Sequence, residues 1–140
     1  MHQKIVAVVD DDLDDLLVVT DALSRFDESV ECKIFYTAED VIESLIDQRD
    51  LLPYCIFIDI NMPRITGVEL LRRLRAHAFL DEVKIVMLST SISEMDMEKL
   101  LAIGANSGFV KPNDEQSYSD IFHSVLNDNI EKVAVKGRRM

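Results

Sequence analysis

The sequence predicts an α/β protein whose five parallel strands form one doubly wound sheet. Short apolar runs alternate with segments in which apolar residues recur every three or four positions, the spacing of one helix face. Strands separated by helices in this way form repeated βαβ units with right-handed crossovers. Polar residues follow four of the apolar runs, at the sheet edge where ligands bind in such folds.

The first two units follow from the apolar spacing. Residues 4–9 form an apolar run, and residues 13–26 place Leu16, Val19 and Leu23 on one helical face. Residues 30–36 alternate apolar and polar positions, which suits a strand nearer the sheet edge. Thr37 is expected to cap a helix that runs to about Gln48.

The third unit contains a helix-capping signal. Residues 54–58 form an apolar strand, and Thr66 with Glu69 is a capping-box pattern for a helix that begins near Gly67. The expected buried stripe of this helix is Val68, Leu71, Leu74 and Ala78. Three arginines of this helix, Arg72, Arg73 and Arg75, are expected to form its solvated face, and the alternative is a docking site for a kinase.

The last two units carry similar signals. Residues 83–88 and 107–110 are the fourth and fifth strands. Two capping patterns are expected to open the following helices, Ser91 with Glu94 and Asn113 with Gln116. The apolar positions of the first helix, which Gly104 ends, are Met95, Leu100 and Ile103, and those of the second are Ile121, Val125, Leu126 and Ile130.

The charge, cysteine content and apolar runs of the sequence argue against some classes of function. The 140 residues are 48% hydrophobic and carry a net charge of −11, which argues against direct binding to nucleic acid. Residues 1–131 are expected to form one domain, followed by a flexible basic tail at residues 132–140. Two cysteines in predicted strands suggest a reduced, cytoplasmic setting, and no apolar run has the length of a membrane span.

Three carboxylates are expected to meet at one edge of the sheet. Asp10 and Asp11 follow the first strand, and Asp59 follows the third. Mutual repulsion between them would be relieved by a hard divalent cation such as Mg²⁺. We expect Asp11 and Asp59 to bind it directly and Asp10 through water, with the backbone carbonyl of Asn61 as a further ligand.

A simpler interpretation exists for the rest of the acidic run. Asp12 is expected to cap the first helix, and carboxylates are favourable in the first turn of a helix, where Asp14 and Asp15 lie. Those three residues are therefore interpreted as helix-end residues, in contrast to Asp10 and Asp11.

The residues after the fourth and fifth strands suit phosphoryl transfer. A carboxylate beside Mg²⁺ can accept a phosphoryl group as an acyl phosphate, and positioned cations and donors stabilise the charge on the transferred group. Lys111 offers an ammonium and Ser89 a hydroxyl. The other interpretation makes both residues ordinary loop positions.

At this point the sequence resembles the receiver domain of two-component response regulators. The matching elements are Asp10-Asp11, Asp59 with Met62-Pro63 and Gly67, the hydroxyl of Ser89, and Lys111-Pro112. The resemblance implies a flavodoxin-like (βα)5 fold with strand order 2-1-3-4-5. The chain also resembles the small receivers that are paired with phytochrome-type histidine kinases.

The resemblance implies roles for these residues. Asp59 would accept a phosphoryl group from a histidine kinase or phosphotransfer protein, with Mg²⁺ or Mn²⁺ bound nearby. Lys111 would pair with the acidic cluster or the phosphoryl group, and Ser89 would turn toward it. The Lys111–Pro112 peptide is commonly cis in this family. Asn61 and Ser91 occupy the two positions that tune the phosphate lifetime.

One position departs from the family. An aromatic residue is usual three positions before the lysine, where this chain has Gly108, and Phe109 should point to the opposite face. The hypothesis is that signalling depends on the loop and helix after Ser89, from Thr90 onward. Gly108 would leave the surface formed by the fourth helix, fifth strand and fifth helix unusually open.

The sequence also suggests how the chain would act on partners, and it leaves two alternative functions open. The residues after Glu131 are too few for an output domain, so a stand-alone receiver acting through a protein partner is expected. A homodimer would use the surface just named, with Phe109 and residues 114–130. One alternative is an interaction module independent of phosphorylation. The other is a phosphatase of the haloacid dehalogenase type, which Asn61 disfavours because that class needs a second Asp there.

Overall fold

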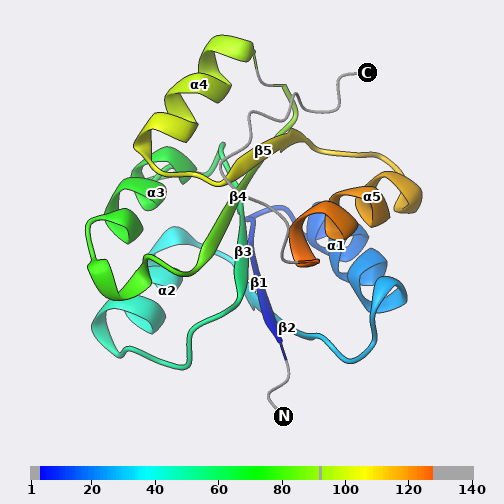
Figure 1. The fold of residues 1–140 in the computed structure, drawn as a ribbon, viewed down its shortest axis with the longest axis horizontal. Coiled ribbons are helices and arrows are strands. Elements are labelled where there is room, and N and C mark those ends of the chain that lie inside the picture. The colour runs from blue at the N-terminus through cyan, green and yellow to red at the C-terminus, as the bar shows by residue number, and fades with distance from the viewer. Residues whose placement is uncertain (1–3, 92, 128–140) are drawn as a thin grey trace.

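A computed structural model describes residues 4–91 and 93–127 (Figure 1). The five strands are β1 (Ile5–Val9), β2 (Glu31–Phe35), β3 (Cys55–Asp59), β4 (Lys84–Ser89) and β5 (Ser107–Val110). The α-helices are α1 (Leu13–Phe26), α2 (Ala38–Val41), α3 (Gly67–Arg75), α4 (Glu94–Ile103) and α5 (Glu115–Leu126). A π-helix, η1 (Ile42–Asp47), and a 3₁₀ turn, η2 (Ala78–Leu80), complete the secondary structure of the described residues.

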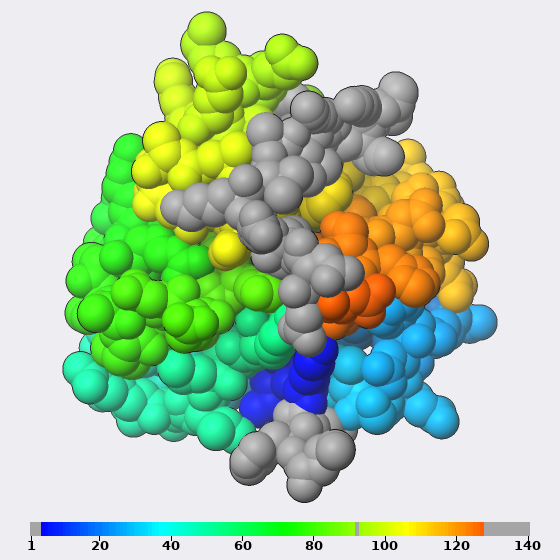
Figure 2. Space-filling model, in the orientation of Figure 1, coloured from blue at the N-terminus to red at the C-terminus, as the bar shows by residue number. Residues whose placement is uncertain are grey.

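The strands form one parallel sheet in the order β2-β1-β3-β4-β5, as predicted. Helices α1 and α5 cover one face, and α2, α3 and α4 cover the other (Figure 1). The space-filling view in the same orientation shows the chain from α2 to α4, in cyan to yellow, on one side and α1 and α5, in blue and orange, on the other (Figure 2). None of the helices in the described segments is long and apolar enough to cross a membrane.

Each face of the sheet has its own buried core, because successive side chains of a strand point in opposite directions. Val9 and Ile58 belong to the core beneath α2, α3 and α4. Val8 and Phe57 belong to the core beneath α1 and α5, where the Phe57 and Phe122 ring centroids lie 5.7 Å apart. Strands buried on both faces explain why their sequences are almost continuously apolar.

Two of the predicted helix caps are wrong by one or two positions. Asp12, Thr37 and Thr66 are N-caps, as expected. Helix α4 is capped by Ser93 rather than Ser91, and α5 by Asp114 rather than Asn113. The side-chain oxygen of a cap must reach an amide of the first helical turn, and these two residues, not the predicted ones, directly precede that turn.

The buried stripes also differ from prediction in two helices. Helix α3 ends at Arg75, so Ala78 belongs to η2 and is exposed, whereas Leu70 is fully buried. In α4 the exposed methionine is Met95, at 66% of its surface, and Met97 is buried. The predicted core position Ile130 and the basic tail at residues 132–140 lie outside the described residues.

The single helix expected after Thr37 is divided. Four residues of α2 are followed by η1, in which the ladder widens and Gln48 N–H donates to the Glu43 carbonyl. Ser44 is buried there, and its hydroxyl donates to Asp50 Oδ2 at 2.9 Å.

Arg75 contradicts the predicted solvated face. Its guanidinium donates to the backbone carbonyls of Gly104, Leu80 and Val83 and to Asn106 Oδ1, over distances of 2.8 to 2.9 Å. These acceptors lie where β4 and β5 begin. The side chain therefore joins the end of α3 to the amino-terminal edge of the sheet, and its role is structural.

Candidate functional site

Four predicted site residues lie at the carboxyl-terminal edge of the sheet. Asp10 follows β1, Asp59 ends β3, Ser89 ends β4 and Lys111 follows β5. The register pairs Asp59 with Leu88 and Ser89 with Val110, so these strands end at the same level. The topology thus brings together side chains that are distant in the sequence.

The three carboxylates form a compact cluster. Asp10 and Asp59 are buried, with 4% and 6% of their surfaces exposed, whereas Asp11 is exposed. One oxygen of each carboxylate lies within 4.8 Å of an oxygen of the other two. Hard oxygen donors at this spacing, two of them buried and one open to solvent, fit a divalent cation such as Mg²⁺ or Mn²⁺.

Lys111 reaches the same cluster from β5. Its Nζ lies 2.9 Å from Asp10 Oδ2, 2.7 Å from Asp15 Oδ2 and 3.3 Å from Asp59 Oδ1. The sequence pattern indicates only a helix-end role for Asp15, so its contact with Lys111 is a feature that the sequence prediction missed. The available signal was the position of Asp15 in the first turn of α1, the helix that begins next to the predicted cluster.

The environment of Asp59 favours its protonated form. Burial, and then the negative charge of Asp10, raise its pKa to about 6, although Lys111 acts in the opposite direction. A cation bound at the cluster would oppose both causes, because positive charge stabilises the ionised carboxylate.

At Lys111 the neighbouring carboxylates outweigh the effect of burial on the pKa. Burial disfavours its ammonium, but hydrogen bonds to Asp15 and Asp10 and the charges of Asp10 and Asp59 together raise its pKa. Lys111 therefore remains a fixed positive charge beside Asp59 across the physiological pH range.

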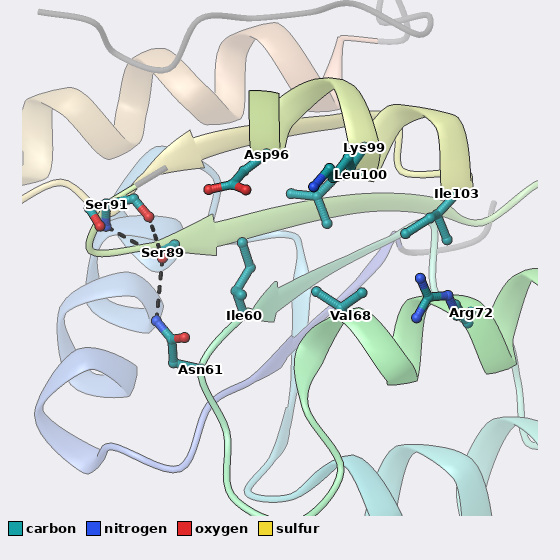
Figure 3. A pocket seen from close by; sticks show the side chains of 10 residues that line it. All are labelled: Ile60, Asn61, Val68, Arg72, Ser89, Ser91, Asp96, Lys99, Leu100 and Ile103. Carbon is teal, nitrogen blue, oxygen red and sulfur yellow. Dashed lines mark hydrogen bonds between the residues drawn. The ribbon is translucent and has the colours of Figure 1, made fainter. Parts of the chain in front are cut away.

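Ser89 is directed toward the loop after β4. Its hydroxyl donates to the Ser91 carbonyl at 2.9 Å and accepts a hydrogen bond from Asn61 Nδ2 at 3.4 Å (Figure 3). The Asn61 amide N–H donates to Asp59 Oδ1 at 3.3 Å. Asn61 therefore bridges Asp59 and Ser89, with its backbone on one and its side chain on the other.

The backbone around the site shows one agreement with the family pattern and one departure. A Cβ at Gly67 would lie 2.7 Å from the Ile60 Cα, so only glycine permits this close approach to the segment after Asp59. The Lys111–Pro112 peptide bond is trans, which contradicts the cis form implied by the resemblance. The Lys111 amide donates to the Ser89 carbonyl at 2.7 Å, which ties the two strand ends together.

The expected open surface at Gly108 is not present. A Cβ at Gly108 would lie 3.0 Å from Met97 Cε, so the thioether of α4 fills the space above this glycine. Phe109 points to the opposite face, as predicted, but only 5% of its surface is exposed. Phe109 therefore cannot contribute to a dimer surface.

The sequence of this chain matches one family model and is similar to several characterised proteins. The family model of the response regulator receiver domain matches residues 6–123. Chemotaxis protein CheY1 of Helicobacter pylori is 26% identical over 124 residues, which are 87% of this chain and 96% of CheY1. A protein-glutamate methylesterase/protein-glutamine glutaminase of Methanospirillum hungatei is 30% identical over 116 residues, 83% of this chain. This chain spans only 33% of that protein's length.

Solved structures share the fold over nearly the whole chain. The phosphorylated cyanobacterial phytochrome response regulator RcpA superposes with a TM-score of 0.82 at 22% identity, covering 92% of this chain and 99% of RcpA. The bacteriophytochrome response regulator RtBRR has a TM-score of 0.76 at 26% identity, with coverages of 96% and 83%. Response regulator Rcp1 in its Mn²⁺-bound form has a TM-score of 0.76 at 20% identity, with coverages of 96% and 99%.

Proposed function

The chain belongs to the response regulator receiver family of two-component signalling, and on this basis we propose that Asp59 is its phosphoacceptor. The phosphoryl donor would be a histidine kinase or a phosphotransfer protein. The observation that carries the proposal is the Lys111 ammonium, held 3.3 Å from Asp59 Oδ1 by two other carboxylates. Receiver domains are generally not enzymes, so the reaction would modify the chain itself.

Asp10, Asp11 and Asp59, with the Asn61 carbonyl, are the residues that would hold Mg²⁺ or Mn²⁺. When bound, the ion would supply positive charge to the oxygens of the transferred phosphoryl group. An oxygen of ionised Asp59 attacks phosphorus, an acyl phosphate O–P bond forms, and the P–N bond to the donor histidine breaks. The electron pair of that bond stays with the imidazole.

Lys111 and Ser89 would contribute fixed and movable donors respectively. Lys111 is already anchored by Asp10 and Asp15, so little reorganisation is needed before its ammonium faces the new negative charge. Ser89 would exchange the Ser91 carbonyl for a phosphoryl oxygen. That exchange would free the Ser91 carbonyl and change the loop that contains Thr90 and precedes α4.

The path from that loop to a partner would pass through α4. Gly108 has no side chain that can move, and Met97 of α4 occupies the space next to it. A change in the loop before α4 would therefore be transmitted by a shift of Met97 against β5. Pro112 fixes the backbone after Lys111 at the other end of β5. Asn61 and Ser91 would set how easily water reaches the acyl phosphate.

Partner surfaces are part of the same proposal. Leu13 and Leu17 lie one turn apart on α1, with 62% and 67% of their surfaces exposed, and α1 begins beside the carboxylate cluster. We assign this apolar stripe to docking of the phosphoryl donor. A homodimer would use the outer surfaces of α4 and α5 without Phe109. Sedimentation in the presence and absence of beryllofluoride tests the dimer, and a monomer in both conditions would exclude it.

Intact mass after incubation with acetyl phosphate and Mg²⁺ tests the phosphoacceptor. A single phosphoryl adduct is expected, and it should be lost in the Asp59→Asn variant and in EDTA. The Asp12→Asn variant is the matched control, because Asp12 is a neighbouring carboxylate that caps α1. The absence of any adduct, together with no response to beryllofluoride, would favour the interaction module that does not depend on phosphorylation.

A further inference from the structure

A groove separates α3 from α4 beside the phosphoacceptor site. It has a volume of about 340 Å³ and is lined by both helices and by the ends of β3 and β4 (Figure 3). Its floor is apolar, formed by Ile60, Val68, Leu100 and Ile103. Two cations also line it, Arg72 from α3 and Lys99 from α4.

Arg72 and Lys99 differ from the other cations of the protein. Within residues 4–91 and 93–127, every other lysine and arginine has a carboxylate, a hydrogen-bond acceptor or an aromatic ring as a partner. Across these same ranges no such partner exists for Arg72 or Lys99, and both are exposed. The next arginine along α3 shows the contrast, since Arg73 Nε lies 3.1 Å from Glu69 Oε2.

Arg72 and Lys99 lack partners among the described residues, although the chain is rich in carboxylates. The sequence has 26 acidic residues and 15 basic ones, so carboxylates outnumber the cations that they can pair with. Two cations without partners would not be expected to line the same groove by chance in so acidic a chain. Helical spacing places them there, because Arg72 lies one turn after Val68, and Lys99 lies beside Leu100 and one turn before Ile103.

We propose that this groove binds an acidic segment of a partner protein. Carboxylates of the segment pair with Arg72 and Lys99, and an apolar side chain between them covers Val68 and Ile103. The apolar floor selects a protein segment over a free inorganic anion, which could use the charges but not the floor. One end of the groove shares Asn61, Ser89 and Ser91 with the proposed phosphoacceptor site, but the test of peptide binding does not depend on phosphorylation of Asp59.

Asp96, at the other end of the groove, determines how the acidic segment is oriented. Asp96 lies one turn before Lys99, at the end where Ser89 and Ser91 line the groove (Figure 3). Its carboxylate repels an acidic ligand there, so the acidic residues lie toward Arg72 and Ile103. The net charge of −11 repels the same ligand at long range, but salt screens that repulsion beyond about 8 Å.

Selection from a displayed library of random peptides tests the proposal and requires no candidate partner. The full chain is the bait, and a variant with Arg72→Gln and Lys99→Gln is the comparison. A variant with Arg25→Gln and Arg73→Gln is the matched control, because it removes the same charge from exposed arginines that already have carboxylate partners, Asp21 and Glu115 for Arg25 and Glu69 for Arg73.

The expected result is enrichment of peptides with an apolar residue flanked by Asp or Glu. Their affinity should fall about tenfold or more on the Arg72/Lys99 variant and less than about twofold on the control, since two ion pairs are lost only in the first. Asp96→Asn should increase the affinity. Amide chemical shifts on binding should change around Val68, Arg72 and Ile103.

Three results would overturn the proposal. They are no enrichment, enrichment of peptides without acidic residues, and equal binding to the two double variants. Unfolding curves of both double variants show whether either has lost the fold. If the Arg72/Lys99 variant is unfolded, the single variants Arg72→Gln and Lys99→Gln are used in its place for the binding comparison.

Discussion

Lys111 and Arg75 are two cations with several polar partners each, and they lie at opposite edges of the sheet. Lys111 Nζ contacts three carboxylates at 2.7 to 3.3 Å, at the edge where the strands end. The Arg75 guanidinium contacts four neutral acceptors at 2.8 to 2.9 Å, at the edge where the strands begin.

The partners determine what each cation does. Carboxylates on side chains can titrate, bind metal or accept a phosphoryl group, and at the Lys111 cluster they outnumber the ammonium. Three of the Arg75 acceptors are backbone carbonyls, fixed in position and unable to titrate. Burial lowers the pKa of Arg75, but hydrogen bonds from all three guanidinium nitrogens offset the cost of that burial. The carboxyl-terminal edge therefore carries groups that can titrate and bind ligands, whereas the contacts of Arg75 at the other edge stabilise the fold.

The largest expected effect is at Arg75. Arg75→Met leaves partly buried carbonyls of Gly104, Leu80 and Val83 without a donor, so the free energy of unfolding should fall by about 3 kcal/mol. Arg75→Lys should restore little, because one ammonium cannot reach acceptors that a guanidinium fork reaches together. Urea unfolding measures both. Arg73→Met, which removes one exposed ion pair, should cost less than about 1 kcal/mol.

Substitution of Asp59 is expected to stabilise the protein, in contrast to substitution of Arg75. Its folded pKa of about 6 lies above the ordinary value of 3.8, so the folded state binds a proton more tightly than the unfolded state does. Stability from this group is complete below about pH 4 and is lost as the pH rises through 6. In EDTA at pH 7.5, Asp59→Asn should raise the free energy of unfolding by up to about 3 kcal/mol, the equivalent of the pKa difference, and the gain should vanish near pH 4.

Urea unfolding at a series of pH values measures that difference. Asp47→Asn is the control, because it neutralises an exposed carboxylate outside the cluster and should change stability by less than about 0.5 kcal/mol. A destabilised Asp59→Asn protein at pH 7.5 would mean that the Lys111 ion pair outweighs burial and repulsion at this edge.

Stabilisation of the chain by a bound metal ion should depend on the carboxylate cluster and not on Arg75. Mg²⁺ at about ten times its dissociation constant should raise the free energy of unfolding of the wild-type chain by about 1.4 kcal/mol. Asp11→Asn should lose most of this gain, because it removes the exposed carboxylate of the cluster. Arg75→Lys should retain the gain in full, since its site lies at the other edge. Thermal unfolding at several Mg²⁺ concentrations gives the comparison, and equal gains in all three proteins would contradict it.

The smallest effect concerns a polar group that the Arg75 network does not reach. Ser107 follows Asn106, is fully buried, and its hydroxyl has no hydrogen-bond partner in the part of the chain that the structure describes. Ser107→Ala should leave stability unchanged or raise it by up to about 1 kcal/mol, because it removes an unsatisfied polar group. A loss of more than about 1 kcal/mol in urea unfolding would show that this hydroxyl is bonded in solution.

The sequence was sufficient to predict the strand order and the convergence of Asp10, Asp59, Ser89 and Lys111. The strand order followed from the resemblance to receiver domains. The convergence followed from regular alternation, because parallel strands bring residues at their carboxyl ends together whatever lies between them. The positions of the α4 and α5 caps were wrong by one or two residues. Several polar residues precede each helix, and only the geometry selects the one that caps.

Other features depend on contacts between distant elements. Arg75 resembles its neighbours on α3 in sequence, and no local pattern indicates that acceptors from η2, β4 and the turn before β5 surround it. Asp15 has a favourable position in a helix end as well as its contact with Lys111, so the simpler explanation concealed the second one. The fit of Met97 over Gly108 likewise joins α4 to β5 through side-chain shape alone.

Localisation of the phosphoryl group tests the central claim most directly. The chain is treated with acetyl phosphate and Mg²⁺ and then with borohydride, which reduces an aspartyl phosphate to homoserine, and its peptides are sequenced by tandem mass spectrometry. The account predicts homoserine at position 59 alone, and none when Mg²⁺ is withheld. Homoserine at position 10 or 11, or labelling independent of Mg²⁺, would contradict the assignment of Asp59 as the phosphoacceptor.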